Sequence, residues 1–154
     1  MLNPFTAGQK LRAVDDVTAH DIRRIVCQTA DSAPSTSTTF LNSSLVLSVV
    51  ASGLYKLTTQ IFVDTNATAD VVLNVLLPSG STVRFSDLGS TTTSTSTSRT
   101  YPGVAAGTVI SCEFSGFIDI DTSSGNLTIQ YRQVSASGST IVKVGSTVEL
   151  TRIA

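Results

Sequence analysis

The chain has 154 residues, a formal net charge of −1 and only 14% charged residues. This length favours a single domain with its own hydrophobic core. The balanced charge and the lack of a basic stripe argue against binding of a nucleic acid through its phosphates. No apolar run approaches the ~20 residues of a membrane-spanning helix, and we expect no signal peptide, because no basic segment precedes an apolar one near residue 1.

The first 21 residues are the most polar part of the chain, and we expect them to form an extended N-terminal arm with at most one helical turn. Its candidate apolar anchors are Phe5, Leu11, Val14 and Val17. Such an arm is either a poorly ordered terminus or a segment that becomes ordered on a partner. The apolar residues favour partner binding. His20, the only histidine, lies in the arm without a rigid scaffold, so we do not expect it to be catalytic.

From residue 22 to residue 154, short runs of alternating apolar and polar residues end at Gly, Pro, Asn or Asp, which is typical of β-strands. The predicted strands are residues 22–29, 38–41, 45–49, 54–63, 70–77, 82–86, 107–120, 126–135, 141–144 and 147–153. About eight to ten strands without a longer helix predict an all-β antiparallel β-sandwich of jelly-roll or Greek-key type. Residues 42–43 are predicted to form a turn, and residues 121–125 a hairpin loop.

Residues 53–86 are the most regular part of the pattern and predict consecutive antiparallel strands, a meander. Alternation along the first strand predicts a core face formed by Tyr55, Leu57, Thr59, Ile61 and Val63. Residues 70–77 carry apolar side chains on both faces. We therefore expect this strand to be central, with a second sheet against one face and a neighbouring subunit against the other.

Three further features bear on the fold. Residues 107–120 and 126–135 predict further core faces, formed by Ile110, Cys112, Phe114, Gly116, Ile118, Ile120, Leu127, Ile129, Tyr131 and Gln133. Residues 87–102 are rich in Ser and Thr and predict either a mobile surface loop or a polar strand at an exposed edge. Cys27 and Cys112 are expected to be free, half-buried thiols.

No catalytic signature is visible, and we expect no enzyme, no catalytic residue and no cofactor. The chain contains no G-x-S-x-G elbow, phosphate-binding P-loop or HExxH motif. Turn carboxylates and amides that offer oxygen ligands to calcium are Asp64, Asn66, Asp70, Asp119 and Asp121. Because Asp and Asn favour turns by bonding to the nearby backbone, the structural interpretation is preferred.

Isolated arginines in the predicted strands are interpreted as edge charges or as members of ion pairs between subunits. They are Arg23, Arg24, Arg132 and Arg152. Edge charges discourage pairing with a foreign strand, whereas subunit ion pairs hold an assembly together. The sequence pattern leaves both roles open.

Three segments carry a resemblance to a known family. They are residues 3–11 (NPFTAGQKL), residues 39–55 together with 70–80, and residues 125–131 continuing through 144–146 to Leu150 and Arg152. In this order they resemble small virion proteins of tailed bacteriophages, especially those that infect actinobacteria. The resemblance covers most of the chain through patterns of strands and turns. It implies a jelly-roll sandwich, often trimeric like the tumour-necrosis-factor type, found in capsid decoration proteins, head fibres and tail-fibre tips.

The resemblance implies a capsid decoration protein that docks through its arm on the major capsid protein or another virion protein. Such a protein is assembled in the host cytoplasm, is carried in the virion and binds neither nucleic acid nor membrane. The alternative is a tail-fibre or tail-tip module that binds a receptor or a carbohydrate, with Tyr101 as an exposed aromatic platform. An enzyme is the least favoured class, since no acid–base cluster is apparent.

Overall fold

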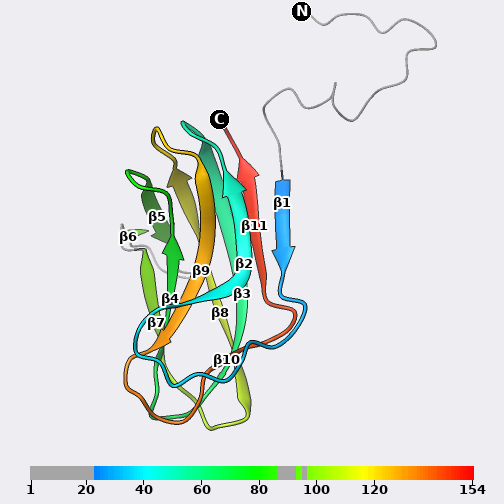
Figure 1. Cartoon of the computed structure of the whole chain (residues 1–154), viewed down its shortest axis with the longest axis vertical. Helices are drawn as coiled ribbons and strands as arrows, with labels where there is room; N and C mark the ends of the chain where they lie inside the picture. The colour runs from blue at the N-terminus through cyan, green and yellow to red at the C-terminus, as the bar shows by residue number, and fades with distance from the viewer. Residues whose placement is uncertain (1–22, 87–92, 95–96) are drawn as a thin grey trace, which may run out of the picture.

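The computed structural model describes residues 23–86, 93–94 and 97–154, which form two antiparallel β-sheets packed face to face (Figure 1). No helix occurs in these described ranges. The predicted all-β antiparallel sandwich is therefore confirmed. The predicted arm residues Phe5, Leu11, Val14 and Val17 lie outside the described part of the chain, as does His20.

The first sheet has seven strands and the second has four. The first contains β1 (Arg23–Cys27), β3 (Leu54–Thr65), β5 (Thr82–Ser86), β6 (Thr93–Ser94), β8 (Thr108–Asp119), β10 (Ile141–Val142) and β11 (Thr147–Arg152). Its order is β1-β11-β3-β8-β5-β6, and β10 also pairs with β3. The second contains β2 (Leu41–Val49), β4 (Val71–Leu76), β7 (Ser98–Tyr101) and β9 (Gly125–Gln133), in the order β2-β9-β4-β7.

The eight strands from β2 to β9 pair in a nested way. β2 pairs with β9, β3 with β8, β4 with β7 and β5 with β6. These pairs alternate between the two sheets, as if one long antiparallel ribbon had been rolled up, which is the topology of a jelly roll. β1 and β11 then extend the first sheet beyond β3.

The predicted meander over residues 53–86 is wrong in its pairing, although its strands are present. β3 and β5 belong to the first sheet and β4 to the second, so the chain crosses the core twice. The predicted hairpin loop at residues 121–125 is wrong for the same reason, because β8 and β9 lie in different sheets. The alternation of apolar and polar residues predicts which face of a strand is buried, but it does not predict which strand will pair with it.

The predicted turn at residues 42–43 is also wrong, because β2 runs through it as one strand. The register with β9 shifts between Asn42 and Val46, which marks a β-bulge. The hydroxyl of Ser43 donates to the carbonyl oxygen of Ile129 at 2.7 Å and accepts from the amide of Leu45 at 3.2 Å. A side chain thus supplies bonds where the bulge interrupts the ladder.

The Ser/Thr-rich stretch contributes two short strands, which brings the number among the described residues to 11. β7 forms the edge of the second sheet, and β6 forms an edge of the first. The predicted polar edge strand is therefore confirmed for residues 98–101. Residues 87–92 and 95–96 lie outside the described part of the chain.

The predicted core faces are confirmed. All five residues predicted for β3 are buried, and so are Leu127, Ile129, Tyr131 and Gln133 of β9. Phe85 and Phe114 meet edge to face at the centre, with ring centroids 5.2 Å apart. β4 lies between β9 and β7, which confirms the predicted central position.

The two cysteines are free, as predicted, but neither is half-buried. Cys112 lies wholly in the core, where burial raises the pKa of its thiol to about 12. Cys27 is exposed on the edge strand β1. The prediction was wrong because Cys27 falls on the outward side of its strand, away from the second sheet.

Candidate interaction surfaces

The outer face of the second sheet is crossed by a ladder of three amide side chains. Gln130 donates to the Oδ1 atom of Asn42 at 2.8 Å, and Asn74 donates to the Oε1 atom of Gln130 at 2.8 Å. The backbone register places the three residues side by side on β2, β9 and β4. These bonds fix the rotamers of three polar side chains and make the middle of this face rigid.

Apolar side chains flank the ladder on both sides. Val46 and Leu76 are 39% and 45% exposed, with Thr128 between them in register. On the other side Phe40 is 37% exposed, and the guanidinium carbon of Arg132 lies 5.0 Å from its ring centroid. We call these residues, with Asn42, Asn74 and Gln130, the amide-ladder face.

The amide-ladder face is almost free of charge. Arg99 and Arg132 are the only charged residues in β2, β4, β7 and β9. Arg99 lies over the ring of Phe85 in the opposite sheet, at 5.6 Å from its centroid. Only Arg132 is therefore left on the outer face, and low charge with an arginine–aromatic pair is typical of the centre of a protein–protein interface.

The predicted strand arginines fall into two groups. Arg23 and Arg24 lie on the edge strand β1, as edge charges should, and their partners are in the same chain. Arg23 forms two 2.7 Å bonds to the carboxylate of Glu149, and Arg24 donates to Ser48. Arg132 and Arg152 lie on the inner strands β9 and β11, so they are not edge charges.

The outer face of the first sheet carries a shallow pocket where β5, β8 and β3 lie side by side. Its volume is about 230 Å³, and it is lined by Leu54, Thr82, Val83, Arg84, Phe117 and Asp119. The ring of Phe117 is 51% exposed there. A second hollow of about 350 Å³ lies farther along β3 and β8, between Lys56 and Glu113.

Sequence reasoning missed Phe117 and misplaced the aromatic platform. Tyr101 is only partly exposed, because it packs against the core and its hydroxyl donates to the carbonyl oxygen of Glu113 at 3.1 Å. The exposed ring belongs to Phe117 instead. The available signal was an aromatic residue on the mostly polar side of the alternation in residues 107–120.

The predicted turn residues accept hydrogen bonds from the backbone. Asp64 accepts from the amide of Gly107 at 3.1 Å, and Asp70 accepts from the amide of Gly103 at 3.0 Å. The Oδ1 atom of Asn66 accepts from the amide of Thr68 at 3.0 Å. Within the described ranges no group of three or more His, Cys, Asp or Glu side chains is placed to hold a metal ion.

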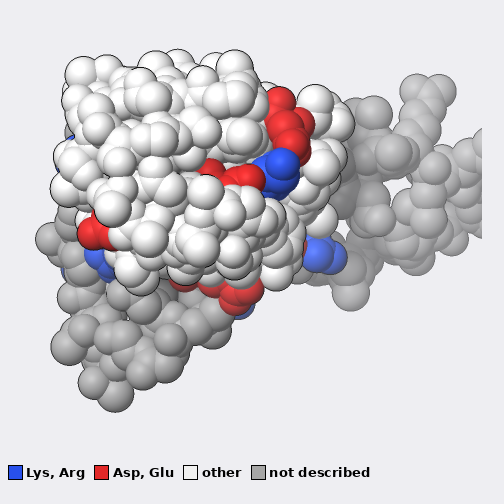
Figure 2. All heavy atoms as spheres, turned by 90° about the horizontal axis from the view of Figure 1, so that it is seen from below, with Lys and Arg blue, Asp and Glu red and all other residues white. Residues whose placement is uncertain are grey.

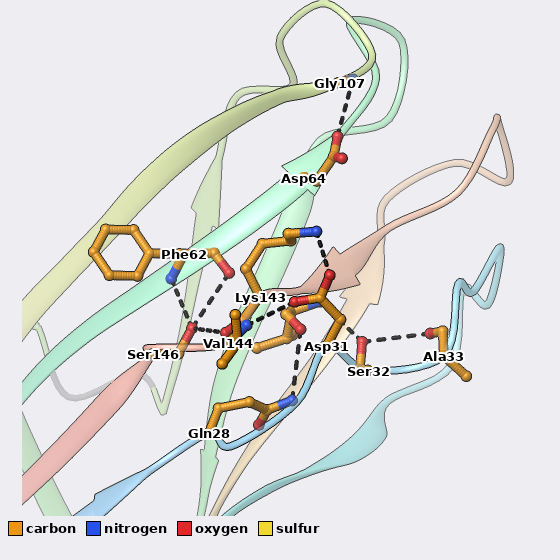
Figure 3. Close-up of polar contacts among 11 residues, drawn as sticks. Gln28, Asp31, Ser32, Ala33, Phe62, Asp64, Gly107, Lys143, Val144 and Ser146 are labelled. Atoms are coloured by element: carbon orange, nitrogen blue, oxygen red, sulfur yellow. Dashed lines mark hydrogen bonds and ion pairs between the residues drawn. The ribbon is translucent and has the colours of Figure 1, made fainter.

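A polar network ties the connection after β1 to the turn between β10 and β11 (Figure 3). Asp31 accepts from the ammonium group of Lys143 and, at 2.8 Å, from the amide of Val144. These bonds, the Lys143 contact foremost, hold the pKa of the Asp31 carboxyl below its ordinary value. The hydroxyl of Ser146 links the same turn to β3 by accepting from the amide of Phe62 at 2.9 Å.

Figure 2 looks at the end of the sandwich that is lowest in Figure 1. Uncharged residues cover most of it, and the charged ones form small groups. The described residues include no helix long and apolar enough to cross a membrane.

Comparison with known proteins identifies no family for this chain. No protein-family model and no curated protein matches the chain. One solved structure that resembles it is titled "Structure of Eiger TNF from S. frugiperda". The two are 14% identical over 88% of this chain and 89% of that one, with a TM-score of 0.33. A TM-score this low supports no conclusion about function.

Proposed function

We propose that this chain is a non-enzymatic structural protein of a bacteriophage virion, a capsid decoration protein that assembles as a trimer. The resemblance of its sequence pattern to small phage virion proteins motivates the proposal. The amide-ladder face is the structural observation that supports it. Jelly rolls are common in viral capsid proteins, although the fold alone implies no function.

The amide-ladder face suits association of identical subunits for electrostatic reasons. Burying it removes a single charged side chain, Arg132, from water, so the desolvation cost is small. The net charge of −1 also gives little repulsion between copies. Val46 and Leu76 would supply the apolar contact.

The same face is already ordered before association. Hydrogen bonds at 2.8 Å hold Asn42, Gln130 and Asn74 in place. Less side-chain entropy is then lost on binding, which favours affinity. The amide-ladder face also includes the outer side of residues 70–77. The sequence pattern predicted a neighbouring subunit on that side.

The mass of the purified full chain in solution tests the proposed assembly. Light scattering is expected to give three times the 16.1 kDa of one chain. Leu76→Lys places a charge in the proposed interface and is expected to give monomers. Val109→Lys is the matched control, because Val109 is equally exposed, at 47%, but lies on β8 of the other sheet.

A monomeric wild-type chain would contradict the trimer. Dissociation by Val109→Lys with no effect of Leu76→Lys would contradict the amide-ladder face as the subunit interface. Electron cryo-microscopy of the virion tests the location: density for this chain is expected over the capsid, and density confined to the tail would instead support the alternative of a tail-tip module.

A further inference from the structure

Phe117 is a large aromatic residue on the outer face of the first sheet. The other outward-facing side chains of β8 are smaller or polar. The backbone register places Arg84 of β5 and Lys56 of β3 directly beside Phe117. Two residues farther along β8, Asp119 lies between its register partners Thr82 of β5 and Leu54 of β3. The six outward side chains form a grid, two residues deep and three strands wide.

Two charged members of the grid, Arg84 and Asp119, have no polar partner within the described residues, whereas Lys56 interacts electrostatically with Glu149. Arg23 and Glu149 on the same face, in contrast, are joined by two bonds of 2.7 Å. A free guanidinium and a free carboxylate thus flank a ring that is 51% exposed.

The size and shape of the pocket limit what would fit. Its volume of about 230 Å³ lies below the usual ~300–1,000 Å³ of pockets for drug-sized ligands, and suits a single small ring. A separate hollow of about 350 Å³ lies farther along the same two strands, β3 and β8, between Lys56, Gln60 and Glu113. A linear chain of such rings would have room to continue along the strands.

We infer that this pocket binds one pyranose unit of a glycan. The ring of Phe117 stacks against the apolar C–H face of the sugar, as aromatic side chains pack on flat apolar surfaces. The carboxylate of Asp119 accepts from neighbouring sugar hydroxyls, and the guanidinium of Arg84 donates to sugar oxygens. A pyranose offers both an apolar C–H face and neighbouring hydroxyls, and these match the aromatic ring and the two charged groups of the pocket.

The guanidinium of Arg84 favours an acidic sugar. Lys56 interacts electrostatically with Glu149, whereas Arg84 has no polar partner within the described residues. A guanidinium binds a carboxylate with two parallel hydrogen bonds. A uronic acid is therefore preferred over a neutral hexose. This inference is independent of the proposed trimer and of the position in the virion.

A nuclear magnetic resonance titration of the full ¹⁵N-labelled chain tests the site. The probes are methyl glucuronide and methyl glucoside. Both are expected to shift amide signals of residues 54–56, 82–84 and 117–119, with a dissociation constant of about 1 mM or weaker, as for one small contact. The glucuronide is expected to bind more tightly than the glucoside.

Variants separate the roles of the side chains. Phe117→Leu keeps an apolar side chain without a flat ring and is expected to weaken the binding of both probes at least tenfold. Arg84→Gln is expected to weaken the binding of the glucuronide more than that of the glucoside. Val109→Ala, which removes an exposed apolar side chain elsewhere on β8, should bind like the wild type.

Three results would overturn the inference: no shift with either probe, shifts confined to other residues, or wild-type binding by Phe117→Leu. A dispersed amide spectrum of each variant shows that it is folded. Binding of both probes with equal affinity would remove the preference for an acidic sugar and leave the pyranose site.

Discussion

The hydroxyl of Thr59 donates a hydrogen bond to the carbonyl oxygen of Phe114 at 3.0 Å and accepts one from the amide of the same residue at 3.2 Å. The two residues are register partners on β3 and β8, the longest pair of strands. Thr59 is buried, so no water replaces these bonds. A side chain therefore helps to join the two central strands of the first sheet.

Thr59→Val is expected to destabilise the protein by about 1–3 kcal/mol, because it leaves two buried backbone groups without this partner. Urea denaturation followed by circular dichroism measures the change. Thr58→Val, the adjacent exposed position on the same strand, is the control and is expected to stay within about 0.5 kcal/mol of the wild type. Equal effects of the two substitutions would contradict a special role for Thr59.

One cysteine is expected to react with a thiol reagent in the native protein. Cys27 is exposed, whereas Cys112 is buried with the pKa of its thiol raised to about 12, so it carries almost no thiolate at neutral pH. A colorimetric thiol assay should count one reactive group in the folded chain and two in urea. The Cys27→Ser variant should show none until it unfolds. Rapid reaction of both thiols without denaturant would be inconsistent with the buried position of Cys112.

Acid is expected to weaken the fold through Asp31 and Glu149. Hydrogen bonds from Lys143 and the Val144 amide lower the pKa of Asp31, and the hydrogen bond from Arg23 lowers the pKa of Glu149. Each folded pKa lies below its unfolded value, so the stabilisation is present above the unfolded pKa and is lost as pH falls through the folded pKa.

The urea midpoint should therefore fall as the pH decreases from about 5 to about 3. The double variant Asp31→Asn, Glu149→Gln cannot lose these interactions by protonation, and it is expected to show a shallower fall. Asp31 is exposed and Glu149 is partly exposed, so the difference is expected to be modest. Identical pH dependence of the variant and the wild type would show that these two carboxylates are not responsible.

Removal of residues 1–21 is expected to leave the sandwich folded, because all the strand pairing that the structure describes lies between Arg23 and Arg152. Under the proposed function the shortened chain should no longer bind capsids that lack the protein, which co-sedimentation measures. Replacing Phe5, Leu11, Val14 and Val17 with Ser in the full chain should have the same effect. A shortened chain that still decorates capsids would show that the arm is not the docking element.

Local alternation in the sequence was sufficient to predict most of the strands and their buried faces, although the strand expected at residues 38–41 is absent apart from Leu41, which begins β2. Tyr55, Leu57 and Ile61 follow the two-residue period, and all three lie in the core. Pairing could not be predicted in the same way, since β2 and β9 are brought together over some 80 intervening residues by the packing of the whole sandwich. The bulge in β2 was misread as a turn, because Asn42 and Ser43 have the residue types of a turn.

The surfaces were harder to predict than the core. The amide ladder depends on Asn42, Asn74 and Gln130 being aligned across three strands, and only the register reveals this. The alternation implied that Phe117 points outward, but it did not reveal that Arg84 and Lys56 of the neighbouring strands lie directly beside it. Tyr101 looked exposed because its neighbours are Ser and Thr, whereas its ring turns towards the core.

The nested pairing also constrains when the protein reaches its final shape. β1 pairs only with β11, and these strands are encoded at opposite ends of the described sequence. Until the ribosome has made β11, β1 has no partner, and β2 likewise has none until β9 is made. Closure of the outer strands is therefore expected late and slowly, because contacts between distant residues delay folding. Until then both edges of β1, and not only the one that stays unpaired in the finished sheet, are open to other chains.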